Sequence, residues 1–467
     1  MLKRLTVFLT VFALLLSCVP AVQAETYETL QSGDRGEQVK KLQTELKNLG
    51  LYPGKIDGVY GKGTVKAVKE FQKQAGLKED GVAGPATQAA LYAGAGSVKA
   101  PSEPEEDESA EVPETPESAV SFLNSVAKNC GAASGTLVLS RNGKTFLTWS
   151  FGKADEKTCF RIASITKWVT AIGLMTLYDD GKLDLDRDIG DYLKFKVRNP
   201  AYPNKAITAR MLLSHTSSLS PDASDYHPDW AKIGKNGYDP IFDESVEPGT
   251  KYAYADYNGA LFGCLIEAIS GESVQHYLNR KVFQPLGLTA AYSPKFLPDG
   301  TATADLLNAK GKVEISVQKD LTRKYNNKAD PKGNNGYTVG KLYISAESLT
   351  KLAQMMLFDG ELYGVRILKP GTVRLMESDQ RGLAESRYGL STVRLNQFER
   401  GTWYGHQGRY SGLSSNIYYQ RETGITMALI MNGYDQKLED NIVAPAVSIL
   451  KNMEKLEAAC LGEDSGT

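Results

Sequence analysis

An apolar stretch at residues 165–178 is hydrophobic on nearly every face of a helix. A helix that is apolar all round is buried in a core. Gly181 provides the usual stop signal just beyond its end. The pattern therefore predicts a buried helix around which the larger part of the chain is organised.

Residues 28–92 show a shorter pattern with an internal repeat. Apolar residues recur at helical spacing in two stripes, and a short third stripe lies near Leu91. The glycine-containing segment 57–61 recurs at 80–84, and each copy is followed by a threonine, Thr64 or Thr87. Glycine-rich turns between helical stripes predict a compact three-helix unit at residues 27–92. This unit has no candidate catalytic cluster.

Residues 118–457 mix strand and helix patterns. Strand-like runs lie at 135–141, 144–150, 388–395, 402–407, 413–419 and 425–431. Asn142 and Gly143 join the first two runs, which is a strong hairpin signal. Helical patterns open this region, fill its middle and close it at 442–456. Strands at both ends predict an α+β fold, with one antiparallel sheet flanked by helices and a helical subdomain inserted.

The two regions are separated by residues 93–117. From Pro101 to Glu117 there are eight acidic residues and four prolines. Such a segment cannot bury apolar area, so we expect an extended, disordered linker. An acidic interaction tail is the alternative. Residues 458–467 are expected to form a terminal tail.

Charge and targeting signals limit the cellular location. Lys plus Arg number 54 and Asp plus Glu 55, so the net charge of −1 gives no reason to expect nucleic-acid or membrane-surface binding. Residues 1–24 carry two basic residues, an apolar run and small residues before Glu25, which predicts a cleaved secretory signal and a secreted, cell-wall-associated protein. A lipoprotein with a lipidated Cys18 is the alternative. No later stretch is long enough to predict a membrane span.

Cysteine and histidine usage argues against a metal centre. Beyond Cys18, the chain has Cys130, Cys159, Cys264 and Cys460, which allow three complete pairings that the sequence cannot distinguish. Neither a Cys-x-x-Cys pair nor a histidine-rich spacing occurs, and there are only four histidines. We therefore predict no metal and no cofactor.

Candidate chemistry lies at the start of the buried helix, where Ser164 and Lys167 share one face. The serine lies beside helix-terminal N–H groups, and a charged lysine is costly in an apolar helix, which favours a basic amine. These are the parts of a lysine-assisted nucleophile. The spacing itself is weak evidence, because Ser-x-x-Lys occurs six times in the chain. An ordinary capping serine is the alternative.

The N-terminal unit resembles the peptidoglycan-binding domain of wall-lytic enzymes. The resemblance is carried by residues 32–36, Val39, Leu42, Gln43, Leu46, residues 52–61, Phe71 and Gln72. It implies that peptidoglycan, through its glycan or stem peptide, is a partner. A packing domain without a ligand is the alternative.

The large domain resembles the serine β-lactamase and penicillin-binding-protein superfamily, and most closely its class C-like carboxypeptidases and esterases. Besides Ser164 and Lys167, the matching segments are 212–219, 247–256, 343–349 and 405–408. Their order along the chain is more specific than any one of them. The resemblance implies a β-lactamase-like fold and a reaction through an acyl-enzyme on Ser164.

The resemblance also implies roles for other residues. Tyr254 and Lys167 are the candidate general bases, and the choice between them stays open. His406 stands where β-lactamases usually carry lysine. A histidine at this position is similar to some carboxypeptidases and esterases. The N–H groups of Ser164 and Arg409 would form the oxyanion hole. By residue type alone, Tyr254 reads as a half-buried aromatic.

Three further positions, Gln407, Gly408 and Asp256, would contact the substrate, and two positions, Asp256 and Arg409, depart from the family pattern. Gln407 and Gly408 lie on the strand expected beside the substrate. Asp256 replaces the usual asparagine of the tyrosine motif, so it could bind a substrate amine or stabilise the charged form of Lys167. Arg409 replaces a small residue and could narrow the cleft or bind a substrate carboxylate. His215 is expected to be a structural residue.

These features predict a secreted, wall-associated serine hydrolase similar to D-alanyl-D-alanine carboxypeptidases and acting on peptidoglycan stem peptides. The wall-binding unit and His406 both favour a peptide over an antibiotic as the natural substrate. A β-lactamase or an esterase on the same fold is the alternative, with β-lactams as ligands. A wall-anchored binding or sensor protein without turnover is the remaining alternative.

Overall fold

The structure is a computed structural model. It describes residues 28–48, 51–52, 54–74, 77–92, 114–221, 241–325, 328–331, 336–380, 388–398, 400–435 and 445–462. The predicted signal peptide, Cys18 and residues 93–113 of the predicted linker lie outside these ranges. The chain divides into two compact units, Met1–Glu108 and Ser109–Thr467.

The N-terminal unit contains the three predicted helices. They are α2 (Glu37–Asn48), α3 (Lys62–Gln74) and α4 (Pro85–Tyr92). Their apolar stripes meet in one small core that includes Val39, Leu42, Val68 and Phe71. The helical prediction for this unit is therefore confirmed.

Two buried glutamines explain the sequence repeat of this unit. Gln43 donates to Asp57 Oδ1 at 2.9 Å and accepts the Gly58 N–H at 2.9 Å. In the second copy Gln72 donates to Asp80 Oδ1 at 2.9 Å and accepts the Gly81 N–H at 2.8 Å. Because a buried amide needs partners at both of its ends, each Asp-Gly turn is fixed to the helix that precedes it.

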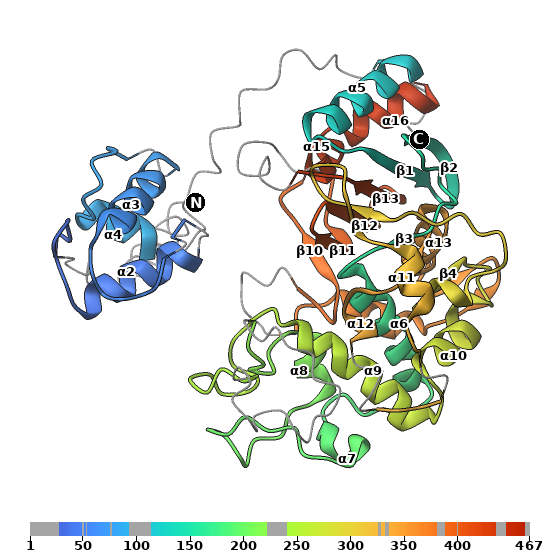
Figure 1. The fold of residues 1–467 in the computed structure, drawn as a ribbon, viewed down its shortest axis with the longest axis horizontal. Helices are drawn as coiled ribbons and strands as arrows, with labels where there is room; N and C mark the ends of the chain where they lie inside the picture. The colour runs from blue at the N-terminus through green and yellow to red at the C-terminus, as the bar shows by residue number, and fades with distance from the viewer. Residues whose placement is uncertain are drawn as a thin grey trace, which may run out of the picture. The chain divides into compact units, whose positions relative to one another are not determined.

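The C-terminal unit is built on a six-stranded sheet in the order β10-β11-β12-β13-β1-β2, with all neighbouring strands antiparallel (Figure 1). The strands are β1 (Ser134–Arg141), β2 (Lys144–Phe151), β10 (Val393–Leu395), β11 (Trp403–Tyr410), β12 (Leu413–Gln420) and β13 (Ile425–Asn432). Pairing of β1 with β13 joins the two ends of the unit. The predicted sheet built from both ends is confirmed.

Helices cover both faces of this sheet. On one face α5 (Pro116–Asn129), α15 (Pro445–Lys451) and α16 (Met453–Leu461) enclose a core with Leu137, Trp149 and Met427. On the other face the core is larger and contains α6 (Ile165–Asp179) and α13 (Ala346–Leu357). Side chains alternate between the two faces along each strand, so β11 presents even-numbered residues to α6.

The middle of the unit contributes short helices and strands around this second core. The helices are α7 (Ile189–Leu193), α8 (Ala209–Leu213), α9 (Asp256–Ser270), α10 (Val274–Leu278), η1 (Asn279–Phe283), η2 (Pro294–Phe296), α11 (Val317–Thr322), α12 (Tyr337–Gly340) and α14 (Pro370–Glu377). The short strands are β3 (Phe160–Arg161), β4 (Ala290–Ala291), β5 (Leu306–Leu307), β6 (Val313–Ile315), β7 (Tyr343–Ile344), β8 (Glu361–Leu362) and β9 (Val365–Arg366).

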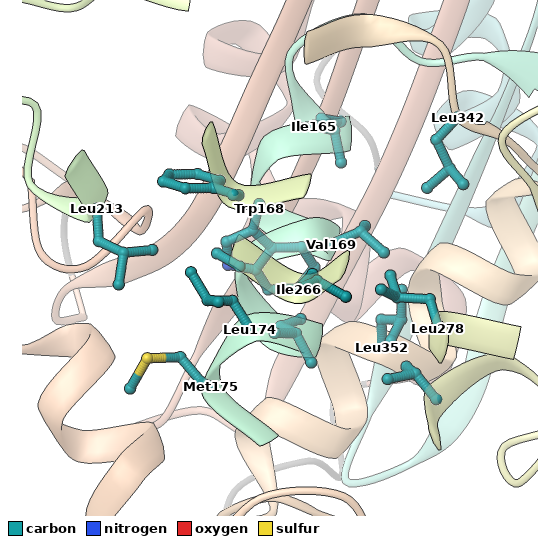
Figure 2. Close-up of a cluster of buried hydrophobic side chains, with 14 of the residues drawn as sticks. Ile165, Trp168, Val169, Leu174, Met175, Leu213, Ile266, Leu278, Leu342 and Leu352 are labelled. Carbon is teal, nitrogen blue, oxygen red and sulfur yellow. The ribbon is translucent and has the colours of Figure 1, made fainter. Parts of the chain in front are cut away.

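Helix α6 is the centre of this core, as its apolar pattern predicts. Every residue from Ile165 to Leu177 is buried. Figure 2 shows Trp168, Val169 and Leu174 of α6 surrounded by residues from other elements, including Ile266 and Leu352. Burial of such side chains stabilises the fold by about 1.5–3 kcal/mol each, so α6 is held firmly in position.

Several predicted boundaries differ from the structure. The hairpin is confirmed, and Asn142 and Gly143 both adopt positive φ, at 49° and 80°. The predicted strand at 388–395 shrinks to β10, because Ser391 has a φ of 52° and forms a turn. The predicted closing helix divides into α15 and α16, which are separated at Asn452.

The ends of the large domain also differ from the prediction, and the structure shows the state of the cysteines. Helix α5 begins at Pro116, two residues before the predicted domain start, and α16 extends to Leu461, inside the predicted tail. Cys130, Cys159, Cys264 and Cys460 form no disulfide within the described part of the chain. In the described ranges no helix combines the length and apolarity needed to cross a bilayer.

Candidate active site

Ser164 precedes the first residue of α6, and the backbone around it is strained. Ala163 has a φ of 47°, a left-handed conformation that an L-residue adopts at a cost. The Ser164 side chain makes no capping hydrogen bond to the helix. Its Oγ instead accepts a hydrogen bond from Lys167 Nζ at 3.0 Å. A serine turned away from its capping role toward an amine is the arrangement that nucleophilic chemistry needs.

Lys167 is fully buried, and its ammonium has three oxygen partners from three elements. Nζ donates to Ser164 Oγ, to the Val339 carbonyl of α12 at 2.8 Å, and forms an ion pair with Asp256 Oδ1 of α9 at 2.7 Å. A buried charge is tolerated only when such partners surround it. The predicted substrate-binding residue Asp256 therefore contacts Lys167 directly, while its side chain stays 44% exposed.

Gly259 provides the space that the Lys167 side chain occupies. A Cβ atom at position 259 would lie 2.7 Å from Lys167 Cγ and 2.9 Å from Cδ. The Gly259 carbonyl accepts a hydrogen bond from Thr338 Oγ1 at 2.7 Å, which fixes α12 against α9. The sequence prediction did not include Gly259, although a glycine inside an apolar helix is a recognisable signal of close packing.

Tyr254 lies beside Lys167, as the resemblance implies. The Lys167 ammonium is 5.4 Å from the centre of the Tyr254 ring. The phenol oxygen is buried and has no hydrogen-bond partner among the described residues. A buried hydroxyl without a partner is costly, so this oxygen is available for a group that a substrate brings.

His406 joins the same site from β11. Its ring centre lies 6.4 Å from that of Tyr254. Nδ1 lies 2.6 Å from the Gln407 carbonyl and Nε2 lies 3.0 Å from the Tyr388 hydroxyl. Burial lowers the pKa of His406 to about 4, although the bond to Gln407 opposes this shift. His406 is therefore a neutral imidazole with its proton on Nδ1, and it accepts from Tyr388.

Gly408 allows β11 to approach the nucleophile closely. A Cβ atom there would lie 2.3 Å from the Ile162 carbonyl and 3.0 Å from Ser164 N. Ser415 Oγ of β12 lies 2.8 Å from the same Ile162 carbonyl. Any larger residue at position 408 would push β11 away from Ser164.

Strand β10 pairs with residues 403–405 of β11. Beyond residue 405, no strand in the described ranges pairs with this edge of β11. The Gly408 carbonyl faces Ser415 of β12, 3.2 Å from its Oγ, whereas the Gln407 carbonyl meets the His406 ring. Because backbone groups alternate between the two edges of a strand, the Arg409 N–H points to the open edge.

The side chains of Gln407 and Arg409 lie on the opposite sheet face from His406. Both are exposed. Burial raises the pKa of the Tyr418 phenol and the Arg409 guanidinium opposes the rise, which places Arg409 on the face of Tyr418 and the terminal helices. The Arg409 side chain therefore does not point toward Lys167.

The structure thus assembles Ser164, Lys167, Tyr254, Asp256 and His406 at one site. Strand β11 supplies Gln407, Gly408 and Arg409 beside it. Within the described residues no group of three or more potential metal ligands is present. The arrangement is suited to attack by a serine on an acyl carbon, with proton transfer through an amine or a phenol.

Comparison with known proteins finds a family match in each of the two units. Residues 122–447 match the beta-lactamase family, and residues 35–91 match the putative peptidoglycan binding domain. Putative penicillin-binding protein PbpX of Bacillus subtilis (strain 168) is 28% identical over 49% of this chain and 56% of its own length. Penicillin-binding protein 4 of Amycolatopsis lactamdurans is 26% identical over 59% of this chain and 72% of its own length.

Solved structures share the fold at lower identity. The octameric penicillin-binding protein homologue from Pyrococcus abyssi has a TM-score of 0.57 and 19% identity, over 73% of this chain and 79% of that chain. D-amino acid amidase from Ochrobactrum anthropi SV3, complexed with L-phenylalanine, has a TM-score of 0.56 and 22% identity, over 73% and 98% of the two chains.

Because the family match spans more than half of the sequence, the chain belongs to the beta-lactamase family, whose members are serine hydrolases. It carries in addition a peptidoglycan-binding domain, which supports peptidoglycan as a partner and a location at the cell wall.

Replacement of Gly259 by alanine should displace Lys167. The added methyl group would overlap the buried lysine stem, and a shift of about 1 Å in a reacting group costs on the order of 10²-fold in rate. We expect the rate of covalent labelling of Ser164 by a fluorescent penicillin to fall by about this factor. Gly371→Ala is the matched control, since a Cβ atom there meets nothing within 4 Å. Equal labelling rates in the two variants would contradict the assignment.

The neutral His406 should make stability depend on pH. Its folded pKa of about 4 lies below the usual 6.5, so the unfolded chain binds the proton more readily. Stability from this residue is complete above pH 6.5 and decreases as the pH falls toward 4, by up to about 3 kcal/mol. Urea unfolding of the wild type and His406→Gln between pH 7 and 4 measures it. The wild type should lose more stability than the variant, and parallel pH profiles would refute the prediction.

Proposed function

We propose that this protein is a D-alanyl-D-alanine carboxypeptidase-like hydrolase that acts on peptidoglycan stem peptides. The observation that carries the proposal is the contact of 3.0 Å between Lys167 Nζ and Ser164 Oγ, at a site that also contains the Tyr254 phenol. The peptidoglycan-binding unit supports a wall polymer as the source of the substrate. Secretion to the wall follows from the predicted signal at residues 1–24.

In the proposed reaction Ser164 Oγ attacks the carbonyl carbon of the penultimate D-alanine. The hydroxyl proton passes to Lys167 as a neutral amine, or to Tyr254 as a phenolate that the neighbouring Lys167 ammonium would stabilise. The oxyanion receives the N–H groups of Ser164 and Arg409. The C–N bond then breaks, the leaving D-alanine takes up the proton, and water hydrolyses the acyl-enzyme in a second step.

The open edge of β11 supports a peptide as the acyl donor. An extended peptide can add to an exposed strand edge through backbone hydrogen bonds. Such a peptide would run past Gly408, while the exposed side chains of Gln407 and Arg409 stay on the other face of the sheet. The role proposed for Arg409 is therefore that of its backbone N–H.

Asp256 favours a second candidate, an amidase or aminopeptidase. One carboxylate oxygen pairs with Lys167, and the side chain is 44% exposed. Ser164 Oγ and Asp256 Oδ1 both lie within 3.0 Å of Lys167 Nζ. A substrate ammonium group beside the scissile carbonyl would therefore lie near the Asp256 carboxylate. Opposite charges attract strongly in such a site.

Assay of three substrates tests the first candidate. Purified protein is offered a D-Ala-D-Ala peptide, a chromogenic cephalosporin and a short acyl ester. We expect D-alanine release that is abolished in Ser164→Ala and reduced about 10²–10⁴-fold in Lys167→Ala and Tyr254→Phe. Release no faster than in Ser164→Ala would remove this candidate. Penicillin labelling without any turnover would support the sensor alternative.

A pair of amides tests the second candidate. A D-amino acid amide with a free amine is compared with its N-acetyl derivative, in the wild type and in Asp256→Asn. If Asp256 binds an ammonium, the preference for the free amine should fall by about tenfold or more in the variant, because a charge-assisted bond of about 1.5–3 kcal/mol is lost. An unchanged preference would eliminate this candidate.

A further inference from the structure

His215 lies in a strained turn next to the site, just after α8. It is fully buried. Its φ is 53°, a left-handed conformation in which asparagine, aspartate and histidine are enriched among L-residues. A buried residue held in such a conformation is determined by its surroundings, and here these surroundings are the segment that carries Tyr254.

His215 accepts hydrogen bonds from the residues on either side of Tyr254. The Ala253 N–H donates to the His215 carbonyl at 2.8 Å. The Ala255 N–H donates to His215 Nδ1 at 3.2 Å. The imidazole also stacks on the Tyr254 ring, with 4.2 Å between centres and 24° between planes. One residue thus fixes the backbone before and after Tyr254 and one face of its ring.

The same nitrogen also receives the side chain of Asn258. Asn258 Nδ2 lies 2.8 Å from His215 Nδ1, and Ser217 Oγ donates to Asn258 Oδ1 at 2.6 Å. The serine therefore determines which end of the amide faces the histidine. With two donors directed at Nδ1, the imidazole carries its proton on Nε2. Burial, reinforced by Lys167 and His406, lowers the pKa of His215 well below its usual range, so the ring is neutral.

Ala255 is also the N-cap residue, directly before the first residue of α9. It has no capping side chain of its own, and His215 Nδ1 accepts its N–H. The next residue is Asp256, whose carboxylate holds Lys167. The contacts of His215 therefore determine where α9 starts and where both Tyr254 and Asp256 lie relative to Lys167.

We propose that His215 is a positioning residue for Tyr254, in addition to being part of the core as its sequence context predicts. It acts through the orientation of the phenol and does not touch the reacting atoms. The inference rests on the proposed acylation of Ser164 with help from Tyr254. An ordinary core histidine would stabilise the fold without a specific link to this one side chain.

Two substitutions separate the contacts of His215. Asparagine tolerates the left-handed backbone and retains an acceptor near the Nδ1 position, but it lacks the ring. Alanine removes both the acceptor and the ring. The exposed His276 provides the control variant, His276→Asn. Thermal unfolding of each variant shows that it is folded at the assay temperature.

The kinetic test is a double-mutant cycle with Tyr254→Phe, read as the rate of Ser164 labelling by a fluorescent penicillin at saturation. We expect His215→Ala to slow labelling about 10²-fold in the wild type and less than threefold in Tyr254→Phe, because the group it positions is already absent. His215→Asn should retain labelling within about tenfold of the wild type. Equal losses from His215→Ala in both backgrounds would overturn the inference.

Crystal structures of the two variants provide a measure that needs no turnover. The Tyr254 hydroxyl should stay near its wild-type position in His215→Asn and move by about 1 Å or more in His215→Ala. An unmoved phenol in the alanine variant would also overturn the inference. If the wild type is not labelled while the phenol moves as expected, the proposed function fails and the positioning role of His215 stands.

Discussion

The ammonium of Lys167 is the constraint on which the rest of the site depends. Removing one charged group from water costs several kcal/mol unless polar partners replace the solvent. Here three oxygens from α6, α12 and α9 do so, at 2.7–3.0 Å. A shift of α12 or α9 away from Lys167 would remove one of these partners, so the buried amine links both helices to the start of α6 at Ser164.

Close approach of the backbone is the second condition, and single residues without bulk provide it. Gly259 admits the lysine stem, and Gly408 brings β11 against the nucleophile. The left-handed φ of Ala163 turns the chain sharply from β3 into α6. Each of these features costs conformational free energy, and the large core around α6 compensates for that cost. The strained backbone at the site is therefore stabilised by the buried core next to it.

The two units combine different kinds of rigidity. In the N-terminal unit, Gln43 and Gln72 repeat one hydrogen-bonding pattern, so two similar turns are fixed by the same chemistry. In the C-terminal unit a packed helix positions a nucleophile. A module that binds a polymer raises the effective concentration of that polymer near an attached enzyme. The N-terminal unit would therefore favour the proposed activity on wall peptides, although each unit has its own core.

The sequence by itself determined the features that depend on local pattern: the buried helix after Ser164, the hairpin at Asn142 and Gly143, the three-helix unit and the α+β class. Motif order along the chain was sufficient to nominate Lys167, Tyr254 and His406. Tertiary structure alone decided which oxygens surround Lys167, that His406 is neutral, and that the Arg409 side chain points away from Lys167. It also revealed the close contact of Gly259 with Lys167, and the hydrogen bonds and ring stacking by which His215 fixes Tyr254. The reason is that periodicity and turn chemistry act between near neighbours, whereas burial, charge pairing and close contact arise between residues far apart in the chain.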